Sequence, residues 1–237
     1  MIVFTSDIDW APEEVIADTL NLFEVYGVKC TLFSTHHSLE LSKSNKKLFE
    51  IGIHPNFNPI LNGSSDKRPD DILDEIMDIH PDAQGIRSHS MLQSTNLLQL
   101  FAERKLLYDA NQFMPYHTDI KPFRLWNGMV RIPYNWEDDV HWAYGYSFDR
   151  SGLELESDNL LVFDFHPIHI FLNTENKYRY NEAKKFYQDP KTLLNYRNKE
   201  VVGTRDLLIS LLSYCKQNKK ETYKMLDVAI DFAKNNP

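Results

Sequence analysis

The sequence has 237 residues, of which 42% are hydrophobic and 25% are charged, and its formal net charge at pH 7 is -8. These values are ordinary for a globular protein, and the length suits one larger α/β domain or two small ones. The chain has no basic block for nucleic acid, no run of about 18 apolar residues for a membrane helix, and too few cysteines for a thiolate zinc cluster.

The first half of the chain alternates between β-rich and helical patterns. Residues 2–5 form a short apolar run, which predicts a strand. The spacing of apolar residues over 11–26 predicts a helix, with Gly27 as its C-terminal stop. The further elements expected here are strands over 29–34, 49–54, 84–88 and 105–109, and helices over 70–79 and 91–104.

The second half opens with an aromatic-rich stretch, residues 111–150. Within it, Asn127 and Gly128 predict a hairpin turn between strands over 123–126 and 129–133. The remaining expected elements are an apolar strand over 160–165, a polar surface insertion over 175–200, and two closing helices over 204–217 and 220–234.

Strands that alternate with helices predict a parallel sheet, and the absence of repeats and linkers predicts one α/β domain over residues 1–237. Barrel enzymes of this class keep their active sites at the carboxyl ends of the strands. A scattered set of core histidines would have no reason to gather there. The residues that follow predicted strand ends are Asp7, Asp9, His54, Arg87, His89 and His166.

Two of the segments at these strand ends combine carboxylate and imidazole groups. Asp7 and Asp9 can divide the work of binding a metal and taking a proton from water, or they can cap a helix. His54 ends an apolar strand, where an imidazole without a partner would be costly. Asn58, four residues further on, is either a weaker metal ligand or a turn residue.

Two later segments add an arginine and three histidines. Arg87 could lower the pKa of a nearby carboxylate and orient it, or form a surface salt bridge, and His89 could be a third metal ligand. His166 and His169 follow an apolar strand, and one of them could protonate a leaving group. Each segment alone has a structural explanation, but together the four favour catalysis.

In this order, the four segments resemble the motifs of the polysaccharide deacetylase superfamily, also called the NodB-homology or carbohydrate esterase family 4 fold. The WbmS-like group is the branch that they resemble most, and the resemblance covers residues 2–172. It implies a distorted (β/α)7-type barrel, closed by C-terminal helices over 204–234. It also implies a bound divalent metal, usually zinc, and hydrolysis of an acetyl group.

The resemblance also implies roles for individual residues. Asp7 corresponds to the catalytic base, Asp9 to a metal ligand, and Arg87 to the arginine that orients the base. His54 corresponds to a second ligand, but Asn58 stands where the family has another histidine. Since His89 stands where the family usually has proline, we hypothesise that His89 replaces the missing ligand.

The last two motifs concern the catalytic acid. His166 fits this acid best, with His169 as its competitor, and residues 136–139 are the candidate source of the carboxylate that supports it. The aromatic residues of the middle segment, Trp136 among them, could stack on sugar faces or lie in the core. The expected substrate-binding residues are Trp10, Trp136, Asp138 and His169.

These inferences predict a cytoplasmic, metal-dependent deacetylase of surface-polysaccharide (O-antigen-like) biosynthesis. Its expected partner is an acetylated sugar or sugar precursor, without nucleic acid and without membrane insertion. Zinc suits a set of nitrogen and oxygen ligands, as do cobalt, nickel, manganese and iron. The oligomeric state has no signature in the sequence.

Three alternatives remain. The same fold could carry a C–N hydrolase of a small amide or cyclic imide. The departure at Asn58 would suit a non-catalytic, sugar-binding pseudo-deacetylase, although such a protein has no need of both a base and an acid. A glycosyltransferase with Asp7 and Asp9 at a nucleotide-sugar metal would leave the histidines without a role.

Overall fold

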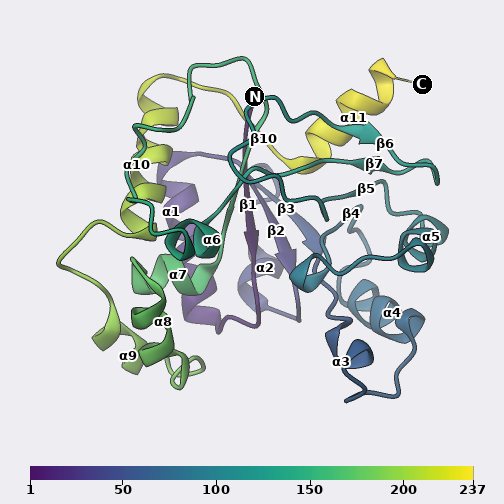
Figure 1. Cartoon of the computed structure of the whole chain (residues 1–237), viewed down its shortest axis with the longest axis horizontal. Helices are drawn as coiled ribbons and strands as arrows, with labels where there is room; N and C mark the ends of the chain where they lie inside the picture. Colours follow the sequence, from purple (N-terminus) through teal and green to yellow (C-terminus); the bar gives the residue numbers. More distant parts are fainter. Residues whose placement is uncertain (237) are drawn as a thin grey trace.

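The structure is a computed structural model that describes residues 1–236. Its centre is a ten-stranded sheet with the order β6-β7-β5-β4-β3-β2-β1-β9-β8, and β10 pairs with β1. All pairs are parallel except the antiparallel hairpin β6–β7. Within the described residues the end strands β6 and β8 do not pair with each other, so the curled sheet forms an open, distorted barrel (Figure 1).

The long strands lie side by side in the middle of the sheet. They are apolar along most of their length because strands of a parallel sheet are covered on both faces. Their bounds are β1 (Ile2–Asp7), β2 (Cys30–Ser34), β3 (Phe49–Ile53) and β9 (Leu161–Phe165). The two-residue strands are β4 (Gly85–Ile86), β5 (Tyr108–Asp109), β6 (Phe123–Arg124), β7 (Val130–Arg131), β8 (Trp136–Glu137) and β10 (Thr222–Tyr223).

Three helices pack against one another on one side of the sheet: α1 (Glu13–Tyr26), α7 (Pro167–Leu172) and α10 (Thr204–Gln217) (Figure 1). The first of them ends at Gly27, whose φ of 68° is the left-handed conformation that glycine adopts without strain. The other helices are α2 (Leu39–Lys43), α3 (Asn58–Leu61), α4 (Pro69–Ile79), α5 (Thr95–Glu103), α6 (Asp138–Ala143), α8 (Lys177–Lys184), α9 (Pro190–Leu193) and α11 (Met225–Asn235), with 3-10 turns η1 (His89–Met91) and η2 (Leu194–Tyr196).

Most of the expected elements are present within a few residues of their predicted bounds. The hairpin around Gly128 is confirmed, with Phe123 paired to Arg131. The expected helix over 220–234 is wrong at its start, because Thr222 and Tyr223 form β10 beside β1 before α11 begins. Among residues 1–236, no helix combines the length and the apolar character that a membrane span needs.

Candidate active site

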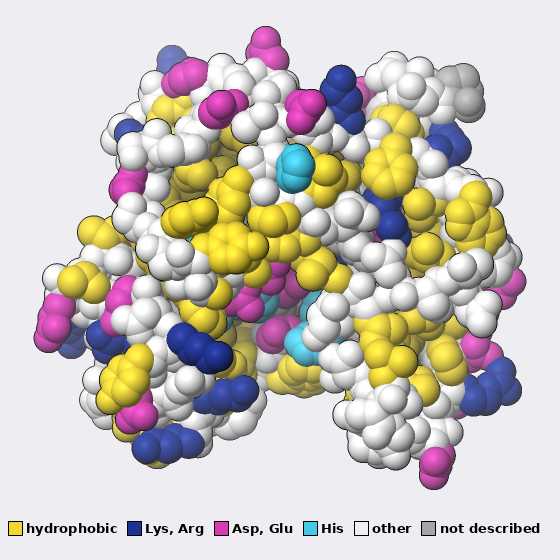
Figure 2. Space-filling model, in the orientation of Figure 1, with side chains coloured by type: hydrophobic (Ala, Val, Ile, Leu, Met, Phe, Trp, Pro, Cys, Tyr) yellow, Lys and Arg dark blue, Asp and Glu magenta, His cyan; other side chains and the backbone are white. Residues whose placement is uncertain are grey.

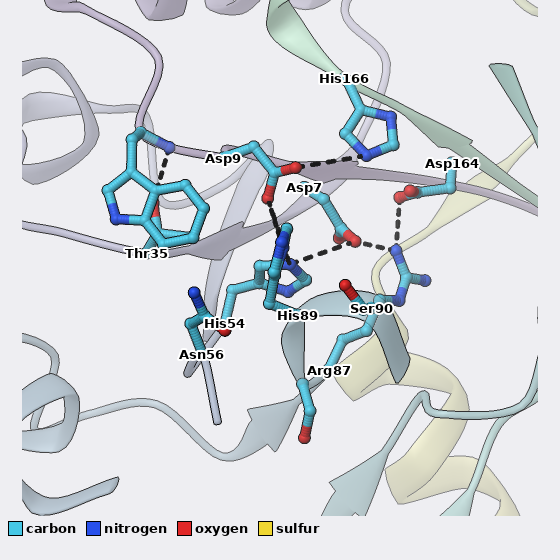
Figure 3. A network of polar contacts seen from close by, with 12 residues as sticks. Asp7, Asp9, Thr35, His54, Asn56, Arg87, His89, Ser90, Asp164 and His166 are labelled. Atoms are coloured by element: carbon cyan, nitrogen blue, oxygen red, sulfur yellow. Dashed lines mark hydrogen bonds and ion pairs between the residues drawn. The ribbon is translucent and has the colours of Figure 1, made fainter. Parts of the chain in front are cut away.

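The site lies at the carboxyl ends of the central strands. Asp7 is the last residue of β1, and Asp9 lies in the loop after it. His54 follows β3, and His166 follows β9. Arg87 follows β4, and His89 begins η1. Because these strands are parallel, their ends meet at one edge of the sheet, and the six side chains converge there (Figure 3).

Asp9, His54 and His89 bring three donor atoms to one point. Asp9 Oδ1 lies 3.3 Å from His54 Nε2 and 3.2 Å from His89 Nδ1, and the two imidazole nitrogens lie 3.2 Å apart. Ligands at about 2.0–2.1 Å from a tetrahedral zinc ion are themselves about 3.3–3.4 Å apart. The three donors therefore have the spacing of one face of such a tetrahedron, and the residues present fit a divalent cation.

The charge balance within this triad favours ionised Asp9. Burial acts to raise the pKa of Asp9, but hydrogen bonds from His54 and His89 hold it far below its usual range. Burial acts to lower the pKa of His54, but the carboxylates of Asp7 and Asp9 outweigh burial and raise it. This half-buried site therefore places an anionic carboxylate oxygen opposite two imidazole nitrogens. Such an environment suits a cation.

Two other groups of acidic and histidine side chains share His166, and in both groups other polar groups already hold some of the ligand atoms. The first group is Asp138, His166 and His169, and the second is Asp7, Asp164 and His166. In the first, Asp138 holds His166 Nδ1 and its backbone N–H. In the second, both carboxylates contact the guanidinium of one arginine, Arg87.

Asn58 lies at the start of α3, next to the triad. Its Nδ2 donates to Ser90 Oγ over 3.1 Å, so its amide supports the residue that follows His89. The φ of Ser90 is 56°, in the left-handed region, and the backbone N–H of His89 donates to the carbonyl of Pro55. These contacts hold His89 beside His54. The sequence had left open whether His89 or Asn58 is the third metal ligand.

Arg87 lies under Asp7 and is completely buried. Its Nη1 donates to Asp7 Oδ1 over 2.8 Å, and the same nitrogen contacts Asp164 Oδ1. The guanidinium carbon lies 4.5 Å from the ring centroid of Phe33 and 4.2 Å from that of Tyr134. Burial opposes the charge, but the two carboxylates raise the pKa of Arg87, so it stays charged and holds one oxygen of Asp7 in place.

Asp164 is a buried member of this network that sequence analysis did not single out. It lies inside β9 and is 0% exposed. Burial raises the pKa of Asp164 to about 7, against the effect of Arg87 and with the added effect of Asp7. Thr5 donates to its Oδ1 over 2.5 Å. The available signal was a carboxylate within an apolar strand, which is stable only where it finds partners.

His166 is held from behind by Asp138. Its Nδ1 lies 2.7 Å from Asp138 Oδ1, and its backbone N–H donates to Asp138 Oδ2 over 2.9 Å. Burial acts to lower the pKa of His166, but Asp138 and Asp9 raise it well above its ordinary value. Its Nε2 points toward Asp9, with 3.8 Å to Oδ2 (Figure 3).

His169 differs from His166 in its partners. Its Nδ1 lies 3.1 Å from the hydroxyl oxygen of Thr174, and burial lowers its pKa. An imidazole without a carboxylate partner is a poorer store for a proton than one that has such a partner. The geometry therefore favours His166 over His169 as a proton donor.

The four expected substrate-binding residues lie in different surroundings. Trp10, 39% exposed, and His169 line a cavity of about 530 Å³ that also contains Asp9 and His166. Trp136 is instead 2% exposed and its Nε1 donates to His141, so burial removes it from the substrate-facing surface. Asp138 is 0% exposed beneath His166 and is not free to contact a ligand. Figure 2 shows histidine and acidic side chains inside the central cleft.

Comparison with known proteins gives relatives of this chain. A family model described as WbmS-like polysaccharide deacetylase matches residues 4–184. A solved structure from Bordetella bronchiseptica, described as a polysaccharide deacetylase involved in O-antigen biosynthesis, is 41% identical; the match covers 90% of each chain, with a TM-score of 0.84. No curated protein matches the sequence.

More distant solved structures share the fold. A peptidoglycan N-acetylglucosamine deacetylase is 14% identical, with a TM-score of 0.55 and coverage of 96% of this chain and 86% of the other. A carbohydrate esterase family 4 pseudoenzyme from Bacillus anthracis is 12% identical, with a TM-score of 0.51 and coverage of 97% and 65%. Together with the nearer relative, they confirm the predicted distorted α/β barrel.

Proposed function

Since this chain belongs to the WbmS-like polysaccharide deacetylase family, we propose that it hydrolyses the acetyl group of an N- or O-acetylated sugar in the synthesis of an O-antigen-like surface polysaccharide. The observation that carries this proposal is the Asp9–His54–His89 triad, which has a carboxylate and an imidazole beside it. Asp7 Oδ2 lies 3.6 Å from His54 Nε2, and His166 Nε2 lies 3.8 Å from Asp9 Oδ2.

We assign the triad as the ligand set of a divalent ion, and zinc is our choice because a carboxylate with two imidazoles is a ligand set of catalytic zinc sites. When bound, such an ion would polarise the acetyl carbonyl and make water a better nucleophile at neutral pH. His89 Nδ1 lies 3.2 Å from Asp9 Oδ1, whereas the amide of Asn58 donates to Ser90 Oγ, and both contacts support His89, rather than Asn58, as the third ligand.

Asp7 is our candidate for the base. Arg87 holds one of its oxygens, and the other oxygen faces the triad. In this position Asp7 would accept a proton from the water that attacks the acetyl carbon. Arg87 would fix the orientation of this carboxylate, because its guanidinium is buried and charged.

His166 is our candidate for the acid. Its Nδ1 is engaged by Asp138, which leaves Nε2 to give a proton to the sugar nitrogen or oxygen as the acetyl bond breaks. The acetyl group then leaves as acetate, and the proton taken by Asp7 balances the one given by His166. Asp138 would stabilise the imidazolium before this transfer.

The proposal is tested by metal content and acetate release together. Protein purified without added metal or chelator would be analysed by elemental mass spectrometry, and acetate release from acetylated monosaccharides would be assayed in parallel. About one ion per chain with acetate release supports the proposal. A metal-loaded protein that releases no acetate from any probe would favour the sugar-binding pseudo-deacetylase.

We also propose that residues 1–237 act as one domain. Helix α10 packs on α1 and α7, and α11 contributes Met225 and Val228 to the core around Val3. The C-terminal helices thus complete the covering of the same sheet that carries the site.

A further inference from the structure

One face of α8 forms a wall of the cavity that contains the triad. Lys177, Tyr180, Asn181 and Lys184 all line this cavity. Their spacing of three, four and seven residues places them on a single face of the helix. Helix α8 belongs to the polar stretch over 175–200, to which sequence analysis assigned no function.

Contacts with the loop after β1 hold this segment in place. The Tyr187 hydroxyl donates to the carbonyl of Asp9 over 2.7 Å, and Gln188 Nε2 donates to the carbonyl of Trp10 over 2.9 Å. The ring of Tyr180 meets the ring of His169 edge to face, with centroids 4.8 Å apart. The wall is therefore attached to the residues that carry the candidate metal site.

The wall brings two positive charges to the cavity. The lysines that form ion pairs within residues 1–236 are Lys29, Lys67 and Lys220, so the ammonium groups of Lys177 and Lys184 are not neutralised by a carboxylate. Both lysines are exposed. Figure 2 shows basic side chains gathered at the lower left of the central cleft, beside the acidic and histidine side chains within it.

The net charge of the whole chain is opposite in sign to the two lysines of this wall. The chain carries a formal net charge of -8, so two lysines beside the site do not reflect a generally basic surface. The carboxylates that line the same cavity are Asp9, which belongs to the triad, and Asp139 on α6. Lys184 Nζ lies 5.5 Å from the centroid of Tyr180, so the charge stands next to a ring that can cover a sugar face.

We propose that Lys177 and Lys184 recognise an anionic group on the acetylated sugar, so that the substrate is an acidic sugar derivative rather than a neutral one. This inference rests on the proposed function. A carboxylate on the sugar ring and a phosphate of a nucleotide carrier share this chemistry. Either anion would contact the ammonium groups while the acetyl group lies at the triad. Tyr180 and Trp142 would flank the sugar ring between the lysines and the triad.

The test compares three probes with the full chain: N-acetylglucosamine, N-acetylglucosaminuronic acid and UDP-N-acetylglucosamine. Acetate release would be measured for the wild type, for the Lys177→Ala/Lys184→Ala double variant and for Lys185→Ala. Lys185 is the matched control because it follows Lys184 directly, is exposed, and does not line the cavity. Circular dichroism would verify that all variants are folded.

We expect the wild type to prefer one anionic probe over the neutral one. In the double variant the ratio of kcat/KM for the anionic probe to that for the neutral probe should fall by about fivefold per lysine, mainly through KM. Lys185→Ala should keep the wild-type ratio. Added salt should reduce the preference in the wild type, because it screens the exposed charges. Preference for the uronic acid would identify a ring carboxylate, and preference for the nucleotide sugar a phosphate.

Two results would overturn the inference. Acetate release with the same probe ratio in the wild type and the double variant would refute the role of the lysines and leave the proposed function intact. Absence of acetate release from all three probes would count against the proposed function, and binding of the same probes by calorimetry would then decide the inference. Equal dissociation constants for the wild type and the double variant would refute it.

Discussion

Asp138 holds His166 with both of its oxygens: Oδ1 lies 2.7 Å from the ring Nδ1, and Oδ2 accepts the backbone N–H over 2.9 Å. Because a carboxylate has no proton to donate, it fixes the ring with Nδ1–H toward Asp138 and leaves Nε2 for chemistry. The two bonds also fix the position of the chain at the end of β9. Asp138 is 0% exposed, so it acts on the reaction through His166 rather than by touching substrate.

The Asp138→Asn variant should lose about 100-fold in kcat, because an amide cannot stabilise the imidazolium form of His166. Its KM and its metal content should stay close to those of the wild type, since Asp138 lies outside the triad. Steady-state kinetics with elemental analysis would measure both. A loss of metal equal to that of His54→Ala would place Asp138 in the ligand set instead.

Asp7→Asn should lower kcat by a factor of about 1,000 or more, because the proposed role of Asp7 is to accept a proton. Its metal content should remain that of the wild type. Asp9→Asn is the matched comparison, two residues away and with the same change of group, and it should lower metal occupancy. Metal loss in Asp7→Asn with retention in Asp9→Asn would reverse the two assignments.

His89→Ala should lower metal occupancy as strongly as His54→Ala, because the two ring nitrogens lie the same 3.2–3.3 Å from Asp9 Oδ1. Asn58→Ala should keep the metal, since the amide of Asn58 bonds to Ser90. Titration of the metal-free variants with zinc, followed by calorimetry, would give the affinities. Weakened binding in Asn58→Ala alone would make Asn58 the third ligand.

Asp164 predicts a specific dependence of stability on pH. Burial raises its pKa in the folded protein to about 7, whereas its ordinary value is 3.8. The folded state therefore binds this proton more tightly than the unfolded state, and stability is lost as pH rises from about 4 to about 7. The upper limit of this loss is about 4 kcal/mol.

Asp164→Asn removes this titration, so its unfolding free energy should improve relative to the wild type as pH rises from 4.5 to 7. Urea unfolding at several pH values would measure the difference in slope. Asp74→Asn is a suitable control, because Asp74 is a surface residue paired with Arg104 and should change the slope little. Identical slopes for Asp164→Asn and the wild type would show that Asp164 is ionised throughout this range.

Local sequence patterns were sufficient for the sheet and for the place of the site. Apolar runs identified β1, β2, β3 and β9, because strands that are covered on both faces must be apolar along their length. Polar residues directly after these runs then had to meet at one edge of a parallel sheet. Asp7, Asp9, His54, Arg87, His89 and His166 could therefore be chosen before any contact was known.

Local patterns were not sufficient for the buried partners. Arg87 and Asp164 are 77 residues apart, and Asp138 and His166 are 28 apart. Trp136 was expected to bind substrate because of its residue type, but it lies on β8 and is buried in the core. Nothing in the spacing of one segment reports which side chain of a distant segment will lie against it.

The sequence by itself thus determined the fold class and the edge of the sheet at which reactive groups gather, because periodicity and strand ends are local properties. Only the tertiary structure decided that His89 stands beside His54, that Asp138 supports His166, and that α8 brings its lysines to the cavity. The physical reason is that these pairings depend on how strands and loops far apart in the chain pack, and packing is a property of the whole molecule.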